Sequence, residues 1–169
     1  MLSSATTAVA TLGGGAVAGL LAAAVMDVPM SRQPEGFTPA YITAAVVTRT
    51  APSAVSFERA MVVHHVTGLL AGVLYGLVAF AAEALLTRVG VAVAVDGAAA
   101  VVAHVVGVVG VVAFVYVFFA HLVLPRAGGV VYEERATAVR GQWLRSAMVF
   151  GGAMLVAAPV VVGVADAAA

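Results

Sequence analysis

The chain has 169 residues, of which 63% are hydrophobic and only 9% are charged, with a formal net charge of zero and a mean hydropathy of +1.12. A soluble domain of this length needs far more polar surface, so the composition excludes that class and indicates an integral membrane protein. The balanced charge also argues against nucleic acid as a partner and leaves the lipid bilayer as the expected surroundings.

Four apolar runs with few charges follow one another along the chain, covering residues 5–26, 60–82, 98–124 and 146–165. As an α-helix, each is long enough to cross a hydrocarbon core of about 30 Å. Their apolar residues are continuous and do not alternate with polar ones, so we expect helices rather than a β-barrel. The sequence therefore predicts an all-α membrane protein, a single domain over residues 1–169 built as a four-transmembrane-helix bundle.

The first span is expected to be retained, because MLSSATTAVATLGGG has no basic segment and the apolar run exceeds that of a signal peptide. It leads into VMDVP, where Pro29 is predicted to end the helix just after Asp27. A carboxylate at a helix C-terminus is disfavoured by the helix dipole. Two interpretations follow: Asp27 is solvated at a turn, which we favour, or an Arg or His side chain holds it.

The connection over residues 27–59 contains four prolines around one short apolar piece, FTPAYITAAVVTRT. Thr38 is a plausible N-cap for this piece, Pro39 suits the first helical position, and Pro52 ends the run. A helix of 11 to 13 residues is too short to span a membrane. We therefore expect a short cytoplasmic interfacial helix, or one that packs against the bundle.

The second span opens with MVVHHVTGLLAGVLYG, which places two adjacent histidines inside an apolar helix. His65 and Glu83 are 18 residues apart, which is five helical turns, so both are expected on one face, predicted to point inward. His64 lies about 100° away, on the side of Ala71 and Tyr75.

Turn signals bound the third span. Asp96 followed by glycine and alanines resembles an N-cap that opens it. Pro125 is predicted to stop it, and the pair Gly128–Gly129 is predicted to form the turn that follows.

A charged amphipathic piece is expected before the fourth span. Trp143 is interpreted as an aromatic anchor at the membrane boundary. Within the span, Pro159 is predicted to remove a backbone hydrogen bond and kink the helix.

The arginines predict the orientation. Seven of the eight lie in the first and third connections and only Arg88 lies in the second. By the positive-inside rule, the first and third connections face the cytoplasm, which places the N-terminus and the C-terminus outside the cell membrane.

Small residues recur at intervals of four along the spans. The sets are Gly15, Gly19 and Ala23; Gly68, Gly72 and Gly76; Ala103 and Gly107; Ala147 and Gly151. Such faces allow close helix contact in lipid, where packing replaces the hydrophobic effect. We expect them to pack within one chain, with a homo-oligomer contact as the alternative.

The histidines are the main functional candidates. His64, His65 and His121 are predicted at similar depth near the cytoplasmic end, where imidazoles from facing helices could bind haem or a transition metal. The alternatives are packing or interface roles and a proton-coupled or solute pathway. His104 is expected near Glu83 at the opposite side, where a hydrogen-bonded polar pair would explain both.

Catalytic patterns are largely missing. The chain has no cysteine, no HExxH, no GxSxG and no P-loop. Glu133–Glu134 matches only part of the intramembrane CAAX-type protease pattern, because the required arginine is Ala138 here. No catalytic residue is therefore assigned, and enzyme activity is disfavoured.

The stretches GGGAVAGLLAAAVMDVPM, PEGFTPAYITAAV and HHVTGLLAGVLYG, within residues 13–82, resemble small four-helix membrane proteins of haloarchaea and other prokaryotes. The resemblance consists of glycine and alanine spacing with the Asp-x-Pro and His-His positions. It implies a polytopic membrane protein, of archaeal type, and supplies no substrate or catalytic residue.

We therefore expect a non-enzymatic accessory or self-associating membrane component, with another membrane protein or a second copy as its partner. Two alternatives stay open. One is a redox subunit that binds haem or a metal through His64 or His65 and His121, and the other is a small proton-coupled transporter.

Overall fold

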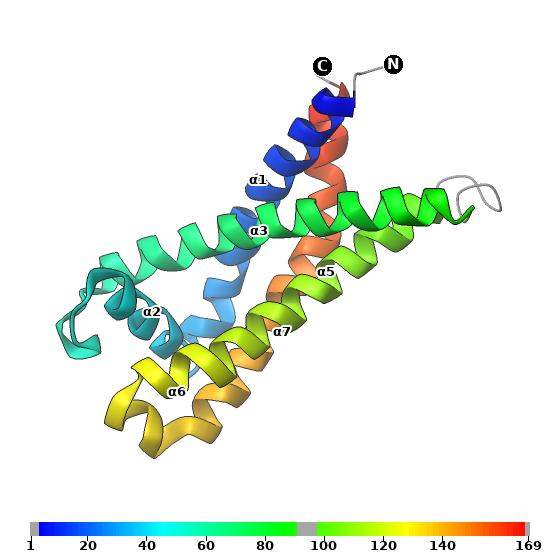
Figure 1. The fold of residues 1–169 in the computed structure, drawn as a ribbon. Coiled ribbons are helices and arrows are strands. Elements are labelled where there is room, and N and C mark those ends of the chain that lie inside the picture. The colour runs from blue at the N-terminus through cyan, green and yellow to red at the C-terminus, as the bar shows by residue number, and fades with distance from the viewer. Residues whose placement is uncertain (1–3, 91–97, 168–169) are drawn as a thin grey trace.

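The computed structural model describes the backbone of residues 4–90 and 98–167 and the side chains of residues 8–90, 99–130 and 132–164. All regular elements in these ranges are helical (Figure 1). In chain order they are α1 (Ser4–Ser31), α2 (Thr38–Thr48), the 3-10 turn η1 (Pro52–Ala54), α3 (Phe57–Arg88), α5 (Ala98–Phe118), the π-helical turn η2 (Phe119–Val123), α6 (Leu124–Ala127) and α7 (Gly129–Ala167).

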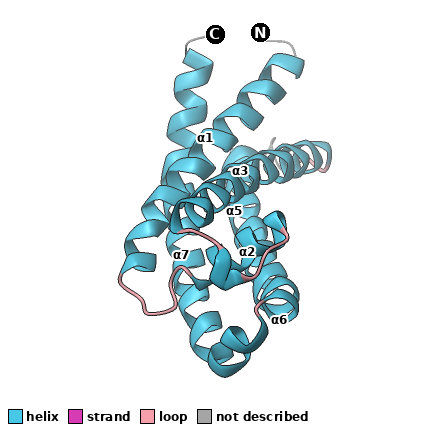
Figure 2. Ribbon diagram, turned by 90° about the vertical axis from the view of Figure 1, so that its left-hand side faces the viewer, coloured by secondary structure: helices cyan, strands magenta, loops and turns pink. Residues whose placement is uncertain are grey.

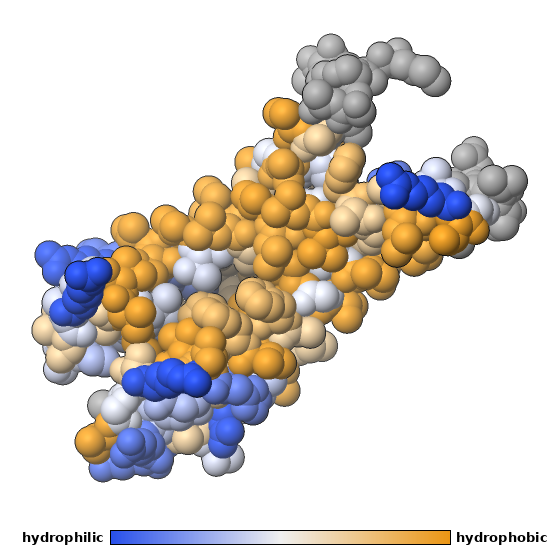
Figure 3. All heavy atoms as spheres, in the orientation of Figure 1, coloured by the Kyte–Doolittle hydropathy of each residue, from blue (hydrophilic) through white to orange (hydrophobic). Residues whose placement is uncertain are grey.

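Four helical segments are long and apolar enough to cross a membrane, which confirms the predicted all-α four-helix bundle. Helix α1 packs against α3 and α7, and α5 completes the bundle by packing against α3 and α7. The start of α1 and the end of α7 lie together at one end, whereas α2 and α6 lie at the other (Figures 1 and 2). Most of the visible surface of the long helices is apolar, with the hydrophilic residues concentrated toward the ends of the molecule (Figure 3).

The contact between α1 and α3 uses the small residues that the sequence singled out. A Cβ atom added to Gly19 would lie 2.7 Å from the Cα atom of Gly72, and one added to Gly15 would run into the Gly72 carbonyl. A Cβ atom on Gly68 would collide with that of Ala23. The prediction that these faces pack within one chain is therefore confirmed, because only residues without larger side chains permit this approach.

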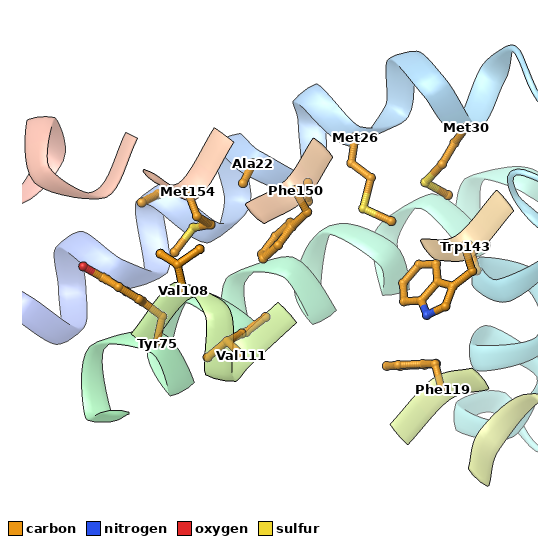
Figure 4. Close-up of a cluster of buried hydrophobic side chains, with 14 of the residues drawn as sticks. Ala22, Met26, Met30, Tyr75, Val108, Val111, Phe119, Trp143, Phe150 and Met154 are labelled. Atoms are coloured by element: carbon orange, nitrogen blue, oxygen red, sulfur yellow. The ribbon is translucent and has the colours of Figure 1, made fainter. Parts of the chain in front are cut away.

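Trp143 belongs to the core and does not point outward as an interfacial anchor would. Its side chain is 7% exposed and packs on Phe119, with ring centroids 5.5 Å apart. Met26 and Met30 of α1 lie on the neighbouring side of the same core (Figure 4). The anchor prediction was wrong because α7 begins well before Trp143, which places the indole within a helix packed against the bundle.

Helix α1 continues through Pro29 to Ser31, so the predicted stop is wrong. A proline removes one helical hydrogen bond but still permits helical φ, and here the next turn holds the chain through a bond from Arg32 N–H to the Pro29 carbonyl. The predicted short helix forms as α2 and has 11 residues, but its ends differ from the prediction. Thr38 is its first residue and not its N-cap, and the helix ends at Thr48, before Pro52.

Pro125 does not stop the third span either. The helix widens into η2, where the Leu124 N–H donates to the Phe119 carbonyl, and then continues to Ala127. A π-helical turn relieves the clash between a proline ring and the carbonyl four residues earlier. The chain reverses at Gly128–Gly129, as predicted, and Gly129 has a φ of 53° that favours glycine.

Helix α7 joins the predicted amphipathic piece to the fourth span. Its backbone departs from helical geometry at Arg135, with φ −128° and ψ 15°, and the helix continues through Pro159. The predicted kink at Pro159 stays a prediction, because the departure from helical dihedral angles lies at Arg135 and does not test it. The predicted N-cap at Asp96 lies outside the described residues.

Candidate functional site

One carboxylate of α1 lies between two histidines of α3. Asp27 Oδ1 is 3.2 Å from His64 Nε2, and Asp27 Oδ2 is 3.1 Å from His65 Nε2. The His64 side chain is 9% exposed, whereas those of Asp27 and His65 are each 29% exposed. This cluster corrects the favoured expectation for Asp27, because the carboxylate lies within the helix between two histidine rings and is not simply solvated at a turn.

The small residues of the helix contact bring this cluster together. Ala23 is one turn before Asp27 on α1, and Gly68 is one turn after His64 on α3. Since Ala23 and Gly68 touch, the short Asp27 side chain can reach across to α3. The continuation of α1 through Pro29 keeps Asp27 within the helix, so its direction is set by the same register.

Hydrogen-bond partners limit where the protons of the two rings can be. The Nδ1–H of His65 donates to the Met61 carbonyl over 2.8 Å, and the Nε2–H of His64 donates to the Ala23 carbonyl over 3.3 Å. A carbonyl only accepts, so each of these ring nitrogens must carry a proton. If His65 is neutral, its Nε2 lone pair faces Asp27 Oδ2, and two acceptors repel unless one more proton is present.

The other carboxylate oxygen of Asp27, Oδ1, lacks a hydrogen-bond donor in the described part of the chain. Asp27 Oδ1 is buried and has no hydrogen-bond partner among the described residues, because the His64 N–H is directed to the Ala23 carbonyl. A buried unpaired oxygen is costly when charged. The cluster therefore has a place for one proton shared between Asp27 and His65.

Two small cavities adjoin His64. A cavity of about 30 Å³ lies within the bundle, and another of about 20 Å³ lies beneath α2. Both are lined by His64, Thr67 and Trp143, and each volume is sufficient for a water molecule. The indole Nε1 of Trp143 is buried without a partner among the described residues. An unpaired donor next to such space is suited to a bound water.

Glu35 forms a second polar cluster, which sequence analysis missed. It is only 6% exposed, and its carboxylate accepts from Arg135 Nη1 at 2.5 Å and from the Thr38 hydroxyl at 2.8 Å. Its backbone N–H donates to Gln142 Oε1 at 2.8 Å. The Arg135 hydrogen bond holds the pKa of the Glu35 carboxyl below its usual value, although burial opposes this. These contacts tie the segment between α1 and α2 to α7.

His104 does not pair with Glu83, contrary to prediction. Its Nε2–H donates to the Leu155 carbonyl at 3.1 Å, so its Nδ1 accepts from the Tyr75 hydroxyl at 2.8 Å. Glu83 is exposed on α3, and the inward face of α3 carries His64 in place of the expected His65. The side shared by His64 and Tyr75 was therefore the buried one.

His121 lies on the surface of the molecule, whereas His64 is buried in the bundle. The His121 side chain is exposed, its ring is 6.2 Å from that of Tyr116, and it lines a surface groove formed by α5 and η2. The remaining pair, His64 and His65, are adjacent on one helix and diverge by about 100°, so they cannot bind opposite faces of one haem. No group of three or more His, Asp or Glu side chains in the described part of the chain is arranged to hold a metal. The residues present therefore do not fit the predicted haem or metal site.

The residues that sequence reasoning missed share a cause. Glu35 and Gln142 are 107 positions apart, and Arg135 is 100 positions from Glu35. Nothing local marks Glu35 in PEGF as more than a turn residue. The prolines and arginines between the first two spans predicted turns and orientation. They could not predict the partners of Glu35, because these partners belong to α7.

No protein-family model matches the chain, and neither the search of curated proteins nor that of solved structures found a significant match. The resemblance to small prokaryotic four-helix membrane proteins therefore stays a prediction.

Proposed function

We propose that the protein is a non-enzymatic membrane component that binds and releases one proton at the cluster of Asp27, His64 and His65. The observation that carries this proposal is that the hydrogen bonds of the cluster account for the protons on two ring nitrogens but leave none between His65 and Asp27. Two ring nitrogens already donate to carbonyl groups, and a third faces a carboxylate oxygen at 3.1 Å. One additional proton converts that repulsive contact into a hydrogen bond.

Access to the cluster is one-sided. Asp27 and His65 are partly exposed near the end of the bundle that carries α2, and the two water-sized cavities extend from His64 toward Trp143. Beyond them, the side chains of Val108, Val111, Phe150 and Met154 fill the core on the way to Tyr75 (Figure 4). This apolar barrier favours reversible proton binding over proton conduction across the molecule.

The end that carries the cluster faces the cytoplasm in this proposal, with both termini outside the cell membrane. Seven arginines belong to the two connections at that end, in accord with the positive-inside rule. The cluster would then respond to cytoplasmic pH, and its protonation would alter the contact between α1 and α3 where a partner protein or a second copy could sense it.

Infrared difference spectroscopy of the full chain in lipid nanodiscs tests the proposal. Across about pH 5 to 8, where histidines ordinarily titrate, we expect correlated carboxyl and imidazole bands. The carboxyl band should vanish in Asp27→Asn, and the imidazole band should lose its coupling in His65→Gln. Glu83→Gln is the matched control, because Glu83 is an exposed carboxylate on the same helix as the two histidines.

An unchanged spectrum in Asp27→Asn would refute proton binding at this cluster. A companion measurement in liposomes separates the rival function, because a proton-coupled transporter sustains pH-dependent flux. We expect no sustained flux, since the apolar side chains between His64 and Tyr75 interrupt the path. Flux that is lost in His64→Gln would favour the transporter.

A further inference from the structure

A surface groove between α1 and α7 combines apolar walls with a basic rim. It has a volume of about 430 Å³ and is lined by Val25, Val28, Pro29, Arg32, Gln33 and Val149. Val25 and Val28 are 48% and 50% exposed, so the apolar wall is open to its surroundings. In a membrane-spanning helix such a wall faces lipid chains.

One arginine lines the rim of the groove, and helix geometry places a second one near it. Arg32 lies just after the last turn of the first span, and Arg145 lies one helical turn before Val149 on α7, on the same face. Neither forms an ion pair with any Asp or Glu of the described residues, and the Arg145 side chain donates a hydrogen bond to the Gly141 carbonyl of its own helix. Both side chains are exposed, so their charges are available to an anion.

The groove also contains acceptors suited to hydrogen-bond donors. Gln33 lines the groove, and its Oε1 is buried and has no hydrogen-bond partner among the described residues, so this oxygen lacks a donor. Pro29 has no N–H to give to the Val25 carbonyl, the ordinary partner one turn earlier. The site therefore offers two cations, acceptors beside them, and an apolar wall that extends along the helices.

We propose that this groove binds one anionic phospholipid whose headgroup carries hydroxyl donors, of the phosphatidylglycerol type. The phosphate would contact Arg32 and Arg145, the headgroup hydroxyls would donate to the Gln33 amide, and an acyl chain would lie along Val25, Val28 and Val149. Arginine suits a phosphate because its guanidinium donates two parallel hydrogen bonds. A free anion would use the arginines but not the apolar wall, and so does not account for the whole groove.

Native mass spectrometry of the full-length protein in detergent tests the proposal, with dioleoyl phosphatidylglycerol, dioleoyl phosphatidylcholine and sodium phosphate as separate probes. We expect the phosphatidylglycerol to bind more tightly than the phosphatidylcholine, and sodium phosphate not to displace it. Arg32→Gln should weaken phosphatidylglycerol binding by about tenfold. Arg126→Gln, which changes an exposed arginine in α6 outside the groove, should leave it unchanged within about twofold.

A second pair of variants tests the apolar wall without altering charge. Val28→Trp should fill the groove and weaken phosphatidylglycerol binding, whereas Val17→Trp should not. Both valines are 50% exposed on α1, so this control matches the change in size and surroundings. The proposal is overturned if Arg32→Gln binds as tightly as Arg126→Gln, if both lipids bind equally, or if sodium phosphate competes as well as free phosphatidylglycerol.

Discussion

His104 supplies a hydrogen-bond donor that Pro159 cannot supply within its own helix. Pro159 has no amide hydrogen, so the Leu155 carbonyl four residues earlier lacks its ordinary helical donor. His104 of α5 supplies that donor through Nε2, and Tyr75 of α3 fixes the other ring nitrogen. A carbonyl within a membrane helix needs such a partner, because lipid offers no donor. The imidazole therefore joins three helices by replacing one backbone hydrogen bond.

The two residues should be energetically coupled. His104→Ala should lower the free energy of unfolding by about 1 to 2 kcal/mol, because it leaves the Leu155 carbonyl unpaired. In a Pro159→Ala background the loss should be smaller by about 0.5 kcal/mol or more, since the introduced alanine supplies a backbone N–H. Reversible unfolding in mixed micelles of all four proteins measures this coupling. Strictly additive losses would contradict the proposed replacement.

Glu35 should make stability depend on acid pH. Its folded pKa is lowered chiefly by the hydrogen bond from Arg135, so the ionised form is stabilised by folding. That contribution is fully present above the unfolded pKa, about 4.3, and is lost as the pH falls through the folded value. Glu35→Gln should lower the free energy of unfolding by about 1 kcal/mol at neutral pH. It should also reduce the fall of that free energy as the pH becomes acid. The measurement is the unfolding free energy against pH.

Glu133→Gln is the control for that experiment, because Glu133 is an exposed carboxylate of α7 near the same break in the helix. Its unfolding profile should follow that of the unchanged protein. If the free energy of unfolding falls equally with acid pH in Glu35→Gln and Glu133→Gln, the link between Glu35 and Arg135 contributes no measurable stability.

The contact between α1 and α3 sets the position of the cluster of Asp27, His64 and His65. Glycines occupy its closest points, and the backbone of each helix touches that of the other. Because the side chain of Asp27 is short, it reaches the two histidines only while this spacing holds. The packing of two elements therefore determines the chemistry of a site one turn away.

Gly72→Ala should separate α1 from α3. The added methyl group would collide with the Gly15 carbonyl, which is backbone and cannot turn aside, so a loss of about 1 to 3 kcal/mol is expected. Gly152→Ala is the matched control, since a Cβ atom there would meet nothing within 4 Å. Thermal unfolding in nanodiscs compares the two variants. A loss in Gly152→Ala equal to that in Gly72→Ala would contradict the close contact.

The two ends of the molecule differ in ways that bear on its orientation. One end carries α2 and α6 with most of the arginines, and the other carries the start of α1 and the end of α7. Both proposed sites lie toward the arginine-rich end, because Asp27 belongs to the last two turns of α1 and Arg32 follows its last residue. Orientation therefore decides which compartment would supply a proton to the first proposed site and which leaflet would supply a lipid to the second.

The absence of cysteine makes orientation directly measurable. Ser53→Cys, exposed between α2 and α3, should be protected from an impermeant maleimide added outside intact cells. Thr87→Cys, exposed near the end of α3, should react with it. Both should react after the membrane is permeabilised. The reverse pattern in intact cells would invert the topology and place the cluster on the outer side.

The amino-acid sequence by itself determined the fold class. Apolar runs longer than a bilayer is thick leave the helix as the economical way to pair every backbone group in lipid, so the four spans could be predicted from composition and length. The spacing of Gly15, Gly19, Gly68 and Gly72 likewise predicted which faces would meet, since small residues at intervals of four allow close approach.

The tertiary structure decided which polar groups meet. Asp27 contacts His64 and His65, His104 binds the carbonyl freed by Pro159, and Glu35 pairs with Arg135 across 100 positions. The prolines misled the prediction because their cost depends on whether another helix or a wider turn can satisfy the freed carbonyl. Periodicity fixes the direction of a side chain on its own helix, but partners depend on the angle and depth at which helices pack, and these are properties of the assembled bundle.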